Sequence, residues 1–271
     1  MSPQPDLTSA FDQVDRAQDP ASFVHRLDMT ADLFGPAKRR TFELLAPLNG
    51  SRLLDVGCGT GEDTRSLARL VGAKGAVLGV DASAVMVSTA KERTSPESLP
   101  VTYFVGDAHH LDFPEGSFDG SRACHVFMHL EDPQKALGEM ARVTRSGGRV
   151  VVYEPDLETW IIHGADRSVT RRILNFRCDS FRSGWVGRAL PALFAAAGLV
   201  DVAIEPSTIV VTDQAFAEQR FGFGDFAAKA QAAGVVSPDE ATQWRRQLQG
   251  AANTGRFFAA LTLFIVSGRK S

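Results

Sequence analysis

A glycine-rich segment after a short apolar run is the part of this chain whose residue types point most directly to chemistry. Residues 53–56 predict a buried parallel strand that contains Asp55, and glycines follow at positions 57, 59 and 61, before a predicted helix over residues 62–70. Glycine lets the backbone turn tightly and approach a ligand without an intervening Cβ. The N-terminus of the following helix offers unpaired N–H groups to a polar or anionic group. The segment therefore predicts a site for a nucleotide-like cofactor.

The spacing of the glycines narrows the choice of cofactor. The dinucleotide fingerprint is G-x-G-x-x-G, whereas this chain has G-x-G-x-G and carries Glu62 where the last glycine of that fingerprint would stand. A carboxylate at that position would repel a pyrophosphate, but it would tolerate a cofactor with a cationic amino-acid tail. Taken alone, the segment also fits a tight turn that binds no ligand.

Two further acids follow predicted strands of the same sheet. Asp81 ends the second strand, about 20 residues after the loop, where a carboxylate can accept hydrogen bonds from both hydroxyls of a ribose. Asp107 ends the third strand between Gly106 and Ala108, where it can accept one from an exocyclic adenine amine. The carboxyl ends of parallel strands form the crevice in which open α/β sheets bind ligands. With Asp55, which can orient the loop, these acids favour a ligand with hydroxyls, amines and a positive charge.

The composition argues against several classes of protein. The chain has 271 residues, a formal net charge of −3 and 44% apolar residues, as expected for an ordinary globular protein without the basic face that generic nucleic-acid binding needs. Its cysteines, at 58, 124 and 178, show no C-x-x-C spacing and are interpreted as reduced thiols. The sequence shows neither a signal peptide nor an uninterrupted membrane span, so we expect a cytoplasmic protein with no membrane partner.

The hydrophobic pattern alternates between strand and helix through the first half of the chain. Residues 21–34 and, after Pro36, residues 37–45 predict two helices that form an N-terminal cap. Strands separated by helical segments then predict right-handed βαβ units and a parallel sheet. The strands are predicted at 52–56, 76–81, 101–106, 118–124 and 148–154, and further helices at 84–93 and 134–144.

The second half of the chain predicts the closure of the sheet and a lid. Two helices, two strands and an Ala/Gln-rich helical insertion between those strands are expected. Their ranges are 168–181 and 186–197 for the helices, 200–204 and 258–267 for the strands, and 213–250 for the insertion. A helical excursion between two strands that close a sheet indicates a lid rather than a second domain.

The ordered motifs resemble those of class I S-adenosylmethionine-dependent methyltransferases. The resemblance covers residues 52–154. Within the class, the sequence is most similar to the ubiquinone/menaquinone-biosynthesis-like and natural-product branch, which acts on small molecules. The motifs are Leu54–Gly61, Gly79–Asp81, Gly106–Ala108, Phe118–Pro133 and Ser146–Arg149. Ser146 stands where the family usually has proline, and this departure affects only a turn. The predicted fold class is α/β: a Rossmann-like, mostly parallel seven-stranded sheet with helices on both faces, an N-terminal helical cap and a helical lid insertion between the last two strands.

The predicted organisation is a single methyltransferase domain over residues 21–271, preceded by a flexible N-terminus at 1–20. Within the domain the parts are the N-terminal cap at 21–48, the cofactor-binding core at 49–155, the rest of the core with a substrate-side loop at 156–212, the lid at 213–253 and the final strand at 254–271.

The resemblance implies S-adenosylmethionine as the cofactor and assigns roles by position. Asp81 would hold the ribose hydroxyls, Asp107 would accept the adenine amine hydrogen, and the backbone of residues 122–124 would approach the sulfonium. The residues implied around the cofactor are Asp55, Gly57, Cys58, Gly59, Gly61, Asp81, Ala82, Met86, Gly106, Asp107, Ala108, Arg122 and Ala123.

Three side chains near the expected sulfonium end are candidates for catalysis. Methyl transfer from a sulfonium is an in-line displacement, in which alignment alone can supply on the order of 7–11 kcal/mol, so a base is needed only where the acceptor must lose a proton. His125 and His129 follow the fourth strand, and Glu154 ends the fifth. A structural role for His129 and a substrate hydrogen bond for Glu154 are the alternatives. No carboxylate or thiolate at ligand spacing joins the two histidines, so no metal site is predicted.

The sequence favours an enzyme that methylates a small-molecule acceptor at O, N or C, in secondary or cofactor metabolism, as a monomer or homodimer. An NAD(P)-dependent oxidoreductase on a similar fold is one alternative, which the glycine spacing and the lack of a Tyr-x-x-x-Lys pair oppose. A catalytically silent S-adenosylmethionine-binding protein is another. A methyltransferase that acts on nucleic acid or protein is opposed by the acidic charge balance.

Overall fold

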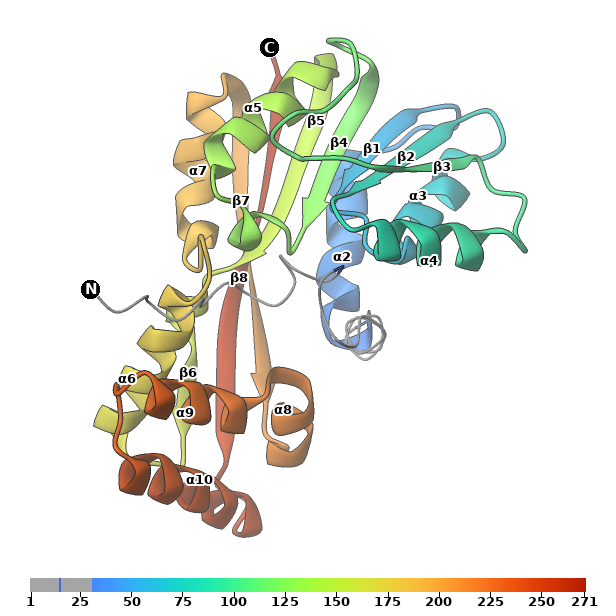
Figure 1. Ribbon diagram of the computed structural model, residues 1–271. Coiled ribbons are helices and arrows are strands. Elements are labelled where there is room, and N and C mark those ends of the chain that lie inside the picture. Colours follow the sequence, from blue (N-terminus) through green and yellow to red (C-terminus); the bar gives the residue numbers. More distant parts are fainter. Residues whose placement is uncertain (1–14, 16–30) are drawn as a thin grey trace.

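A mostly parallel sheet forms the centre of the protein (Figure 1). The computed structural model describes residue 15 and residues 31–271. Within them the strands are β1 Arg52–Val56, β2 Ala76–Asp81, β3 Val101–Val105, β4 Phe118–Cys124, β5 Thr144–Pro155, β6 Ile161–His163, β7 Leu199–Val211 and β8 Phe258–Lys270. Their order is β3-β2-β1-β4-β5-β8-β6, and β7 pairs with β8. Strands β1 to β5 are parallel, whereas β8 is antiparallel to its three neighbours.

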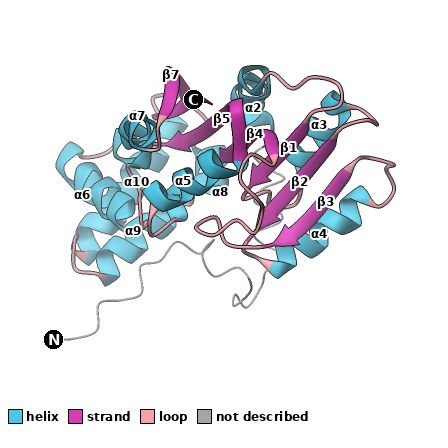
Figure 2. Cartoon of the chain, turned by 90° about the horizontal axis from the view of Figure 1, so that it is seen from above, coloured by secondary structure: helices cyan, strands magenta, loops and turns pink. Residues whose placement is uncertain are grey.

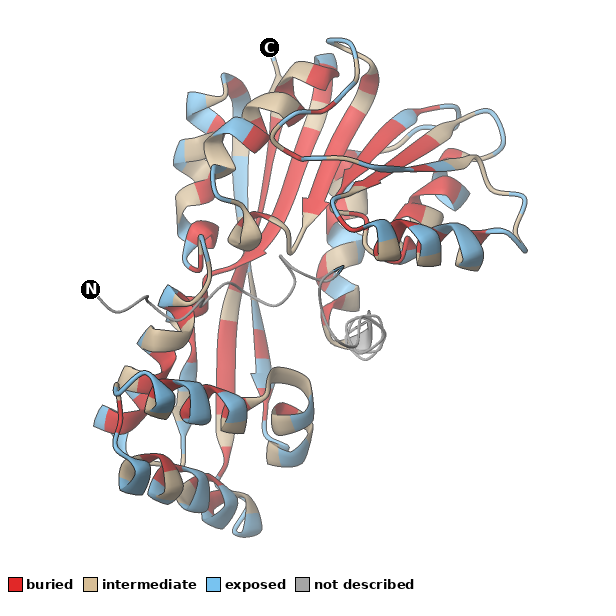
Figure 3. Ribbon diagram, in the orientation of Figure 1, coloured by how far each residue is buried: buried red, intermediate tan, exposed pale blue. Residues whose placement is uncertain are grey.

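The central strands are buried on both faces, which explains their apolar sequences. Leu53 and Leu54 point to opposite faces of β1, and both are buried, as are Val151 and Val152 of β5. Successive side chains of a strand alternate between the faces, so a strand of this kind needs cover on both. Figure 3 shows that buried residues concentrate in these strands.

Helices supply that cover, as Figure 2 shows from above. Helices α2 Ala31–Leu45, α3 Glu62–Val71 and α4 Ala84–Thr94 lie on one face, and α5 Pro133–Val143 and α7 Val186–Ala196 lie on the other. Leu53 belongs to the cluster of the first face, and Leu54 belongs to that of the second. The glycine loop connects the last residue of β1 to the start of α3, so it lies at the carboxyl edge of the sheet.

Capping residues set where several helices begin. The Ser83 hydroxyl accepts the Met86 N–H at the start of α4, and the Asp132 carboxylate accepts the Lys135 N–H at the start of α5. Such caps satisfy N–H groups that have no partner within the helix. Pro133 follows Asp132 at the first helical position, where its missing N–H costs nothing.

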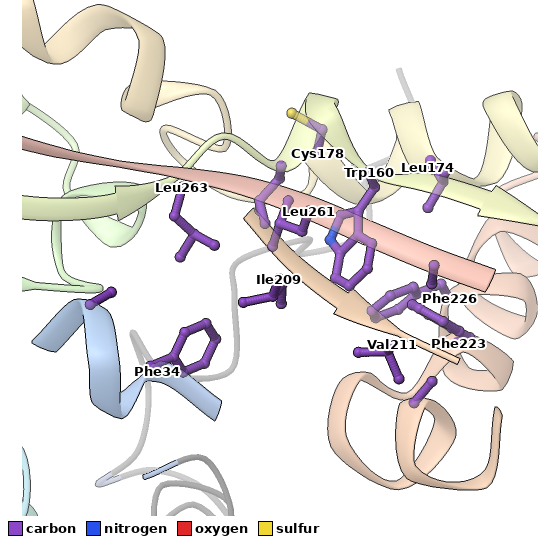
Figure 4. Packing of buried hydrophobic residues seen from close by; sticks show 14 of the residues in the cluster. Phe34, Trp160, Leu174, Cys178, Ile209, Val211, Phe223, Phe226, Leu261 and Leu263 are labelled. Atoms are coloured by element: carbon purple, nitrogen blue, oxygen red, sulfur yellow. The ribbon is translucent and has the colours of Figure 1, made fainter. Parts of the chain in front are cut away.

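The outer halves of β7 and β8 extend beyond the parallel strands and carry the lid. Helices α6 Arg167–Asp179, α8 Gln214–Phe221, α9 Phe223–Ala232 and α10 Pro238–Asn253 gather around this extension with β6. Trp244 of α10 donates from Nε1 to the Thr170 hydroxyl of α6 at 2.8 Å. Trp160, which follows the short helix η3 Leu157–Thr159, packs against Phe223 and Phe226 (Figure 4). Aromatic packing therefore joins the lid to the sheet.

The predicted fold class is confirmed, including the helical lid between the last two strands. The three-residue strand β6 is an eighth strand that the pattern did not predict. Strand β7 runs to Val211, well past the predicted 200–204, whereas β8 begins at 258 as predicted and ends at Lys270 rather than 267. Apart from residue 15, the residues predicted as a flexible N-terminus lie outside the described residues, as do most of those predicted as the first cap helix. The division of the chain into cap, core and lid ranges stays a prediction.

The predicted helix break at Pro36 is wrong, because α2 runs through it from Ala31 to Leu45. Proline removes one intrahelical hydrogen bond. Burial of Phe34 and Ala37 on either side of it holds the helix against the sheet. None of the helices in the described ranges combines the length and apolar character needed to cross a bilayer.

A buried ion network ties the sheet to α2 and α3. Arg122 of β4 is only 1% exposed, and its guanidinium donates to Asp55 at 3.1 Å, to Asp63 at 2.8 Å and to the Thr41 hydroxyl at 2.7 Å. Lys38 Nζ of α2 lies 3.2 Å from a second oxygen of Asp63. A charge buried so completely is tolerated only when it is paired and hydrogen-bonded.

We expect Arg122→Met to lower the free energy of unfolding by about 3–5 kcal/mol, because Asp55 would remain buried without its cationic partner. Arg145→Met is the matched control: its pair with Asp119 is about half exposed, so its loss should cost less than about 1 kcal/mol. Urea unfolding followed by circular dichroism measures both. Equal and small losses would contradict a structural role for the network.

Candidate functional site

The glycine loop turns through backbone conformations that glycine adopts without strain. The φ angles of Gly57, Gly59 and Gly61 are 68°, 51° and 76°, all in the left-handed region. The Gly57 N–H donates to the Val80 carbonyl of β2 at 2.7 Å, which anchors the start of the loop. Gly61 immediately precedes α3, so the free N–H groups of that helix open beside the loop.

Two of the glycines are also required by the packing of the protein itself. A Cβ on Gly57 would lie 2.1 Å from Cγ2 of Val126, and one on Gly61 would lie 2.4 Å from the Tyr103 hydroxyl oxygen. Cys58 lies between them with a buried side chain, and burial raises the pKa of its thiol well above the ordinary value. The loop is therefore closely packed on its inner side.

Asp81 joins this loop to the start of α4. Its carboxylate accepts the Gly59 N–H at 2.8 Å through one oxygen and the Ser83 N–H at 2.9 Å through the other. Burial raises the pKa of Asp81, although both N–H bonds act to lower it. One carboxylate thus fixes two backbone segments that border the expected ribose position.

Asp15 lies at the N-terminus of α4. Its carboxylate accepts a hydrogen bond from the Ser83 hydroxyl and from the N–H groups of Ala84 at 2.8 Å and Val85 at 3.3 Å. An acid at this position satisfies free N–H groups and interacts favourably with the helix dipole. Sequence reasoning missed this contact, because nothing local pairs residue 15 with a helix almost 70 residues away.

Among the residues predicted beside the adenine, Ala82, Gly106 and Ala108 follow the ends of β2 and β3, whereas Met86 lies in the first turn of α4. Ala82 is exposed, whereas Met86 and Ala108 are buried. The Gly106 N–H donates to the Asp81 carbonyl at 3.0 Å, so the ends of β2 and β3 are held side by side. Ala82, Gly106 and Ala108 therefore lie at the carboxyl edge of the sheet, and their contact with an adenine stays a prediction.

Asp107 presents an exposed carboxylate at that edge. Its Oδ1 accepts the backbone N–H of His109 at 2.9 Å and lies 2.7 Å from His109 Nδ1, while the side chain is 65% exposed. Burial acts to raise the pKa of Asp107, but the hydrogen bonds from His109 outweigh it and lower the pKa. His109 Nε2 in turn accepts the Asp132 N–H at 3.3 Å. The sequence analysis did not predict that His109 connects Asp107 to Asp132. The available signal was Asp107 itself, because an Asp side chain often accepts the backbone N–H of the residue two positions later.

The two predicted residues on β4 point away from each other. Ala123 is buried among the residues packed beneath α5 and α7, and the Arg122 side chain belongs to the ion network on the opposite face. Asp55 also belongs to that network, with its second oxygen accepting the Thr64 hydroxyl at 2.7 Å. Burial raises the pKa of Asp55, although Arg122 acts to lower it.

Glu154 is buried, and both of its oxygens bind backbone. Oε1 accepts the N–H groups of Val126 at 2.6 Å and Phe127 at 2.8 Å, and Oε2 accepts that of Met128 at 3.3 Å. Burial raises the pKa of Glu154 to about 7, against the lowering by these N–H groups. The geometry makes Glu154 a positioning residue for the loop after β4, and its predicted catalytic role stays a prediction.

His125 adopts a positive φ of 58° and packs between two rings. Its ring centroid lies 4.6 Å from that of Phe34 and 5.0 Å from that of Tyr153. Nε2 is buried and makes no hydrogen bond to the described residues. Burial, followed by the charges of Lys38 and Arg220, lowers the pKa of His125 to about 3, so the ring is neutral at physiological pH.

His129 ends the short helix η2, Phe127–His129. Its N–H donates to the Val126 carbonyl at 2.9 Å, and its ring lies 5.6 Å from that of Phe181. Within residues 31–271 and at residue 15, no group of three or more His, Cys, Asp or Glu residues is arranged to hold a metal ion. A base role for either histidine stays a prediction.

Two surface depressions lie away from this edge. One, of about 310 Å³, is bordered by Lys91, Thr94 and Val101, and the other, of about 140 Å³, is bordered by Leu48 and Arg149. Both lie at the amino ends of the strands, and neither contains a residue of the candidate site.

Comparison with known proteins identifies similar sequences and folds. A family model described as a methyltransferase domain matches residues 54–152. A protein of Streptomyces fradiae, described as an uncharacterized 37.1 kDa protein in transposon TN4556, is 36% identical over 250 residues, which cover 92% of this chain and 70% of that protein. Aklanonic acid methyltransferase DauC of Streptomyces sp. (strain C5) is 32% identical over 150 residues, which cover 55% of this chain and 64% of DauC. The chain thus spans about two thirds of the length of these relatives.

Among solved structures, the YcgJ protein of Bacillus subtilis superposes on 87% of this chain and 98% of its own, with a TM-score of 0.62 and 20% identity. At this level of identity the likeness concerns the fold. It supports a Rossmann-like arrangement of the sheet and helices.

We expect Glu154→Gln to change how stability depends on pH. The folded pKa of about 7 lies above the ordinary 4.5, so the folded protein retains a proton that the unfolded chain loses between those values. Stability from Glu154 is therefore present below pH 4.5 and lost as the pH rises to about 7, a difference of up to about 3 kcal/mol.

Urea unfolding between about pH 5 and pH 8 measures this dependence. The fall in stability should be shallower in Glu154→Gln than in the unmodified protein. Glu131→Gln, at a carboxylate that is 84% exposed, should leave the profile unchanged. Identical profiles for all three proteins would show that Glu154 does not titrate in this range.

Proposed function

We propose that this chain, which belongs to the class I S-adenosylmethionine-dependent methyltransferases, transfers a methyl group from S-adenosylmethionine to a small-molecule acceptor. The observation that carries the proposal is the placing of Asp81 and Asp107 at the ends of the neighbouring strands β2 and β3, beside the glycine loop. S-adenosylmethionine supplies an electrophilic methyl group on a sulfonium with a good leaving group.

The donor set of the chain fits this cofactor. Each oxygen of Asp81 accepts one N–H group, so each keeps a lone pair for a ribose hydroxyl. Asp107 uses Oδ1 for His109, and its exposed Oδ2 makes no hydrogen bond to the described residues, which suits it to an adenine amine. Gly57, Gly59 and Gly61 would lie against the methionine part.

The charge of the site favours a cationic cofactor over a dinucleotide. Asp81 and Asp107 are not ion-paired with a lysine or arginine within the described chain, and Glu62 is exposed at the start of α3. These carboxylates would repel a pyrophosphate and attract a sulfonium and an α-amino group. This argument supports the methyltransferase over the nicotinamide-dependent alternative.

Alignment, rather than acid–base chemistry, is the main contribution that the chain makes to catalysis in this proposal. Glu154 fixes the loop that carries His125 and His129. With a pKa of about 3, His125 is a weak base, which can accept a hydrogen bond from the acceptor but removes only an acidic proton. A catalytic base at His125, His129 or Glu154 is therefore a secondary part of the proposal.

A small-molecule acceptor is supported by the net charge of −3, which disfavours nucleic acid, and by the relative that is named for aklanonic acid. Secondary metabolism, a cytoplasmic location and a monomeric or homodimeric state belong to the same proposal.

We expect Asp107→Asn to weaken the binding of S-adenosylhomocysteine about tenfold, the equivalent of about 1.4 kcal/mol. An amide keeps an oxygen for His109 but presents an NH₂ group to the adenine amine, which needs an acceptor. Isothermal titration calorimetry measures the affinity. Asp112→Asn, at an exposed acid of the same loop, should bind like the unmodified protein. An unchanged affinity in Asp107→Asn would remove this residue from the adenine site.

A further inference from the structure

Aromatic and cationic side chains form a chain of contacts from the core into the lid. The ring centroids of His125 and of Phe34 on α2 lie 4.6 Å apart, and the guanidinium carbon of Arg220 on α8 lies 5.9 Å from the Phe34 centroid. Arg220 also lies 5.3 Å from the ring of Phe221, which is 4.9 Å from Trp160. The contacts thus lead from the end of β4 to the buried indole beneath the lid.

A second series of contacts returns from that indole to the loop after β4. It passes through Phe223 at 5.4 Å and Phe226 at a further 5.8 Å, and the Phe226 centroid lies 3.3 Å from the guanidinium carbon of Arg177 on α6. Arg177 is 5.3 Å from the ring of Phe181, which is 5.6 Å from that of His129. Because His125 and His129 belong to one loop, the two series close into a ring, here called the acceptor ring.

Three members of the acceptor ring carry buried nitrogens that make no hydrogen bond to the described residues. They are Nε2 of His125, Nε1 of Trp160 and Nε of Arg177. Buried polar groups are nearly always hydrogen-bonded, so several exceptions in one contact ring need an explanation. The indole N–H and the guanidinium are donors only. A ligand that satisfies them must therefore bring hydrogen-bond acceptors, and for a cationic guanidinium a negatively charged oxygen is the strongest such partner.

Arg177 differs from its neighbour on the same helix in having no carboxylate partner among the described residues. Arg172 binds Glu240 at 2.5 Å. The surroundings of Arg177 are instead the rings of Phe226 and Phe181, which attract a cation but do not neutralise it. Burial, and then the charge of Arg220, lowers the pKa of Arg177 to about 9, so the side chain is still cationic at neutral pH.

We propose that the methyl acceptor is a flat apolar molecule with a carboxylate, which binds the guanidinium of Arg177, and with a second oxygen that accepts the Trp160 N–H. This inference rests on the proposed function. The aromatic side chains of the acceptor ring suit the apolar body of such a molecule. A guanidinium can bind a carboxylate through two parallel, charge-assisted hydrogen bonds. Since rings lie over the guanidinium, the carboxylate approaches its edge. The acceptor must also part the rings that cover these nitrogens, so it binds by induced fit.

The test uses the full chain with S-adenosylhomocysteine bound, and three pairs of probes. Benzoate, 2-naphthoate and anthracene-2-carboxylate are each compared with the neutral primary amide of the same ring system. Isothermal titration calorimetry should show that at least one acid binds ten times more tightly than its amide. Arg177→Met should abolish this preference, while Arg171→Met, at an exposed arginine of the same helix, should retain it. The proposal is overturned if no acid is preferred, or if Arg177→Met keeps the preference.

A second measurement needs no probe. Methionine fills the space of the arginine stem and packs well against rings, so Arg177→Met should raise the melting temperature of the ligand-free protein by roughly 2–4 °C. Arg172→Met, which loses the ion pair with Glu240, should not raise it. A lower melting temperature in Arg177→Met would mean that its charge is compensated in the free protein, contrary to the proposal.

The affinity for S-adenosylhomocysteine separates this inference from the proposed function. If the unmodified protein fails to bind it, the proposed function is contradicted. If it binds while the acids show no preference over their amides, only the inference about the acceptor fails.

Discussion

The pairing of Arg122 with two acids is the interaction on which the rest of the site depends. Asp55 precedes the glycine loop and Asp63 follows it, and the same guanidinium binds both. The Thr64 hydroxyl crosses the loop as well, to the second oxygen of Asp55. The ends of the loop are thus held at a fixed separation by a residue of the neighbouring strand β4. The position of the loop glycines relative to the sheet follows from that constraint.

Acids hold the other loops of the carboxyl edge in a similar way. Asp81 binds Gly59 and Ser83, and Glu154 binds three successive N–H groups after β4. Each of these carboxylates stands near the end of one strand. It accepts backbone N–H groups from the segment that follows a neighbouring strand, and Asp81 also accepts one from the segment that follows its own strand. A carboxylate of this kind can be read from sequence as a ligand for a cofactor or as a base, although its oxygens first serve the fold. Asp107, the third predicted acid that follows a strand at this edge, differs from these two because its carboxylate stays largely exposed.

Local patterns predicted the parts of the fold that local physics decides. The alternation of apolar strands and amphipathic helices predicted the sheet and the lid. The spacing of the glycines and acids also predicts that the carboxyl edge binds the cofactor, and this stays a prediction. Long-range partners were not predictable in this way. Arg122 and Asp55 are 67 residues apart, and nothing near Glu154 in sequence indicates that it binds Val126 and Phe127. Pro36 predicted a helix break that the structure does not show. The prediction failed because the burial that keeps α2 continuous comes from tertiary packing, which the local sequence does not reveal.

The charges of the site divide between its two halves, and this division bears on the chemistry. Carboxylates border the carboxyl edge of the sheet beside the glycine loop, whereas Lys38, Arg177 and Arg220 lie on α2, α6 and α8. Burial and then the charges of Lys38 and Arg220 lower the pKa of His125. A cationic methyl donor and an anionic acceptor would therefore each face the opposite charge. If the carboxylate itself receives the methyl group, both charges vanish as the new bond forms, and an apolar ring favours that transition state over the separated charges. If another atom of the acceptor reacts, the carboxylate orients it instead, and the gain is one of alignment.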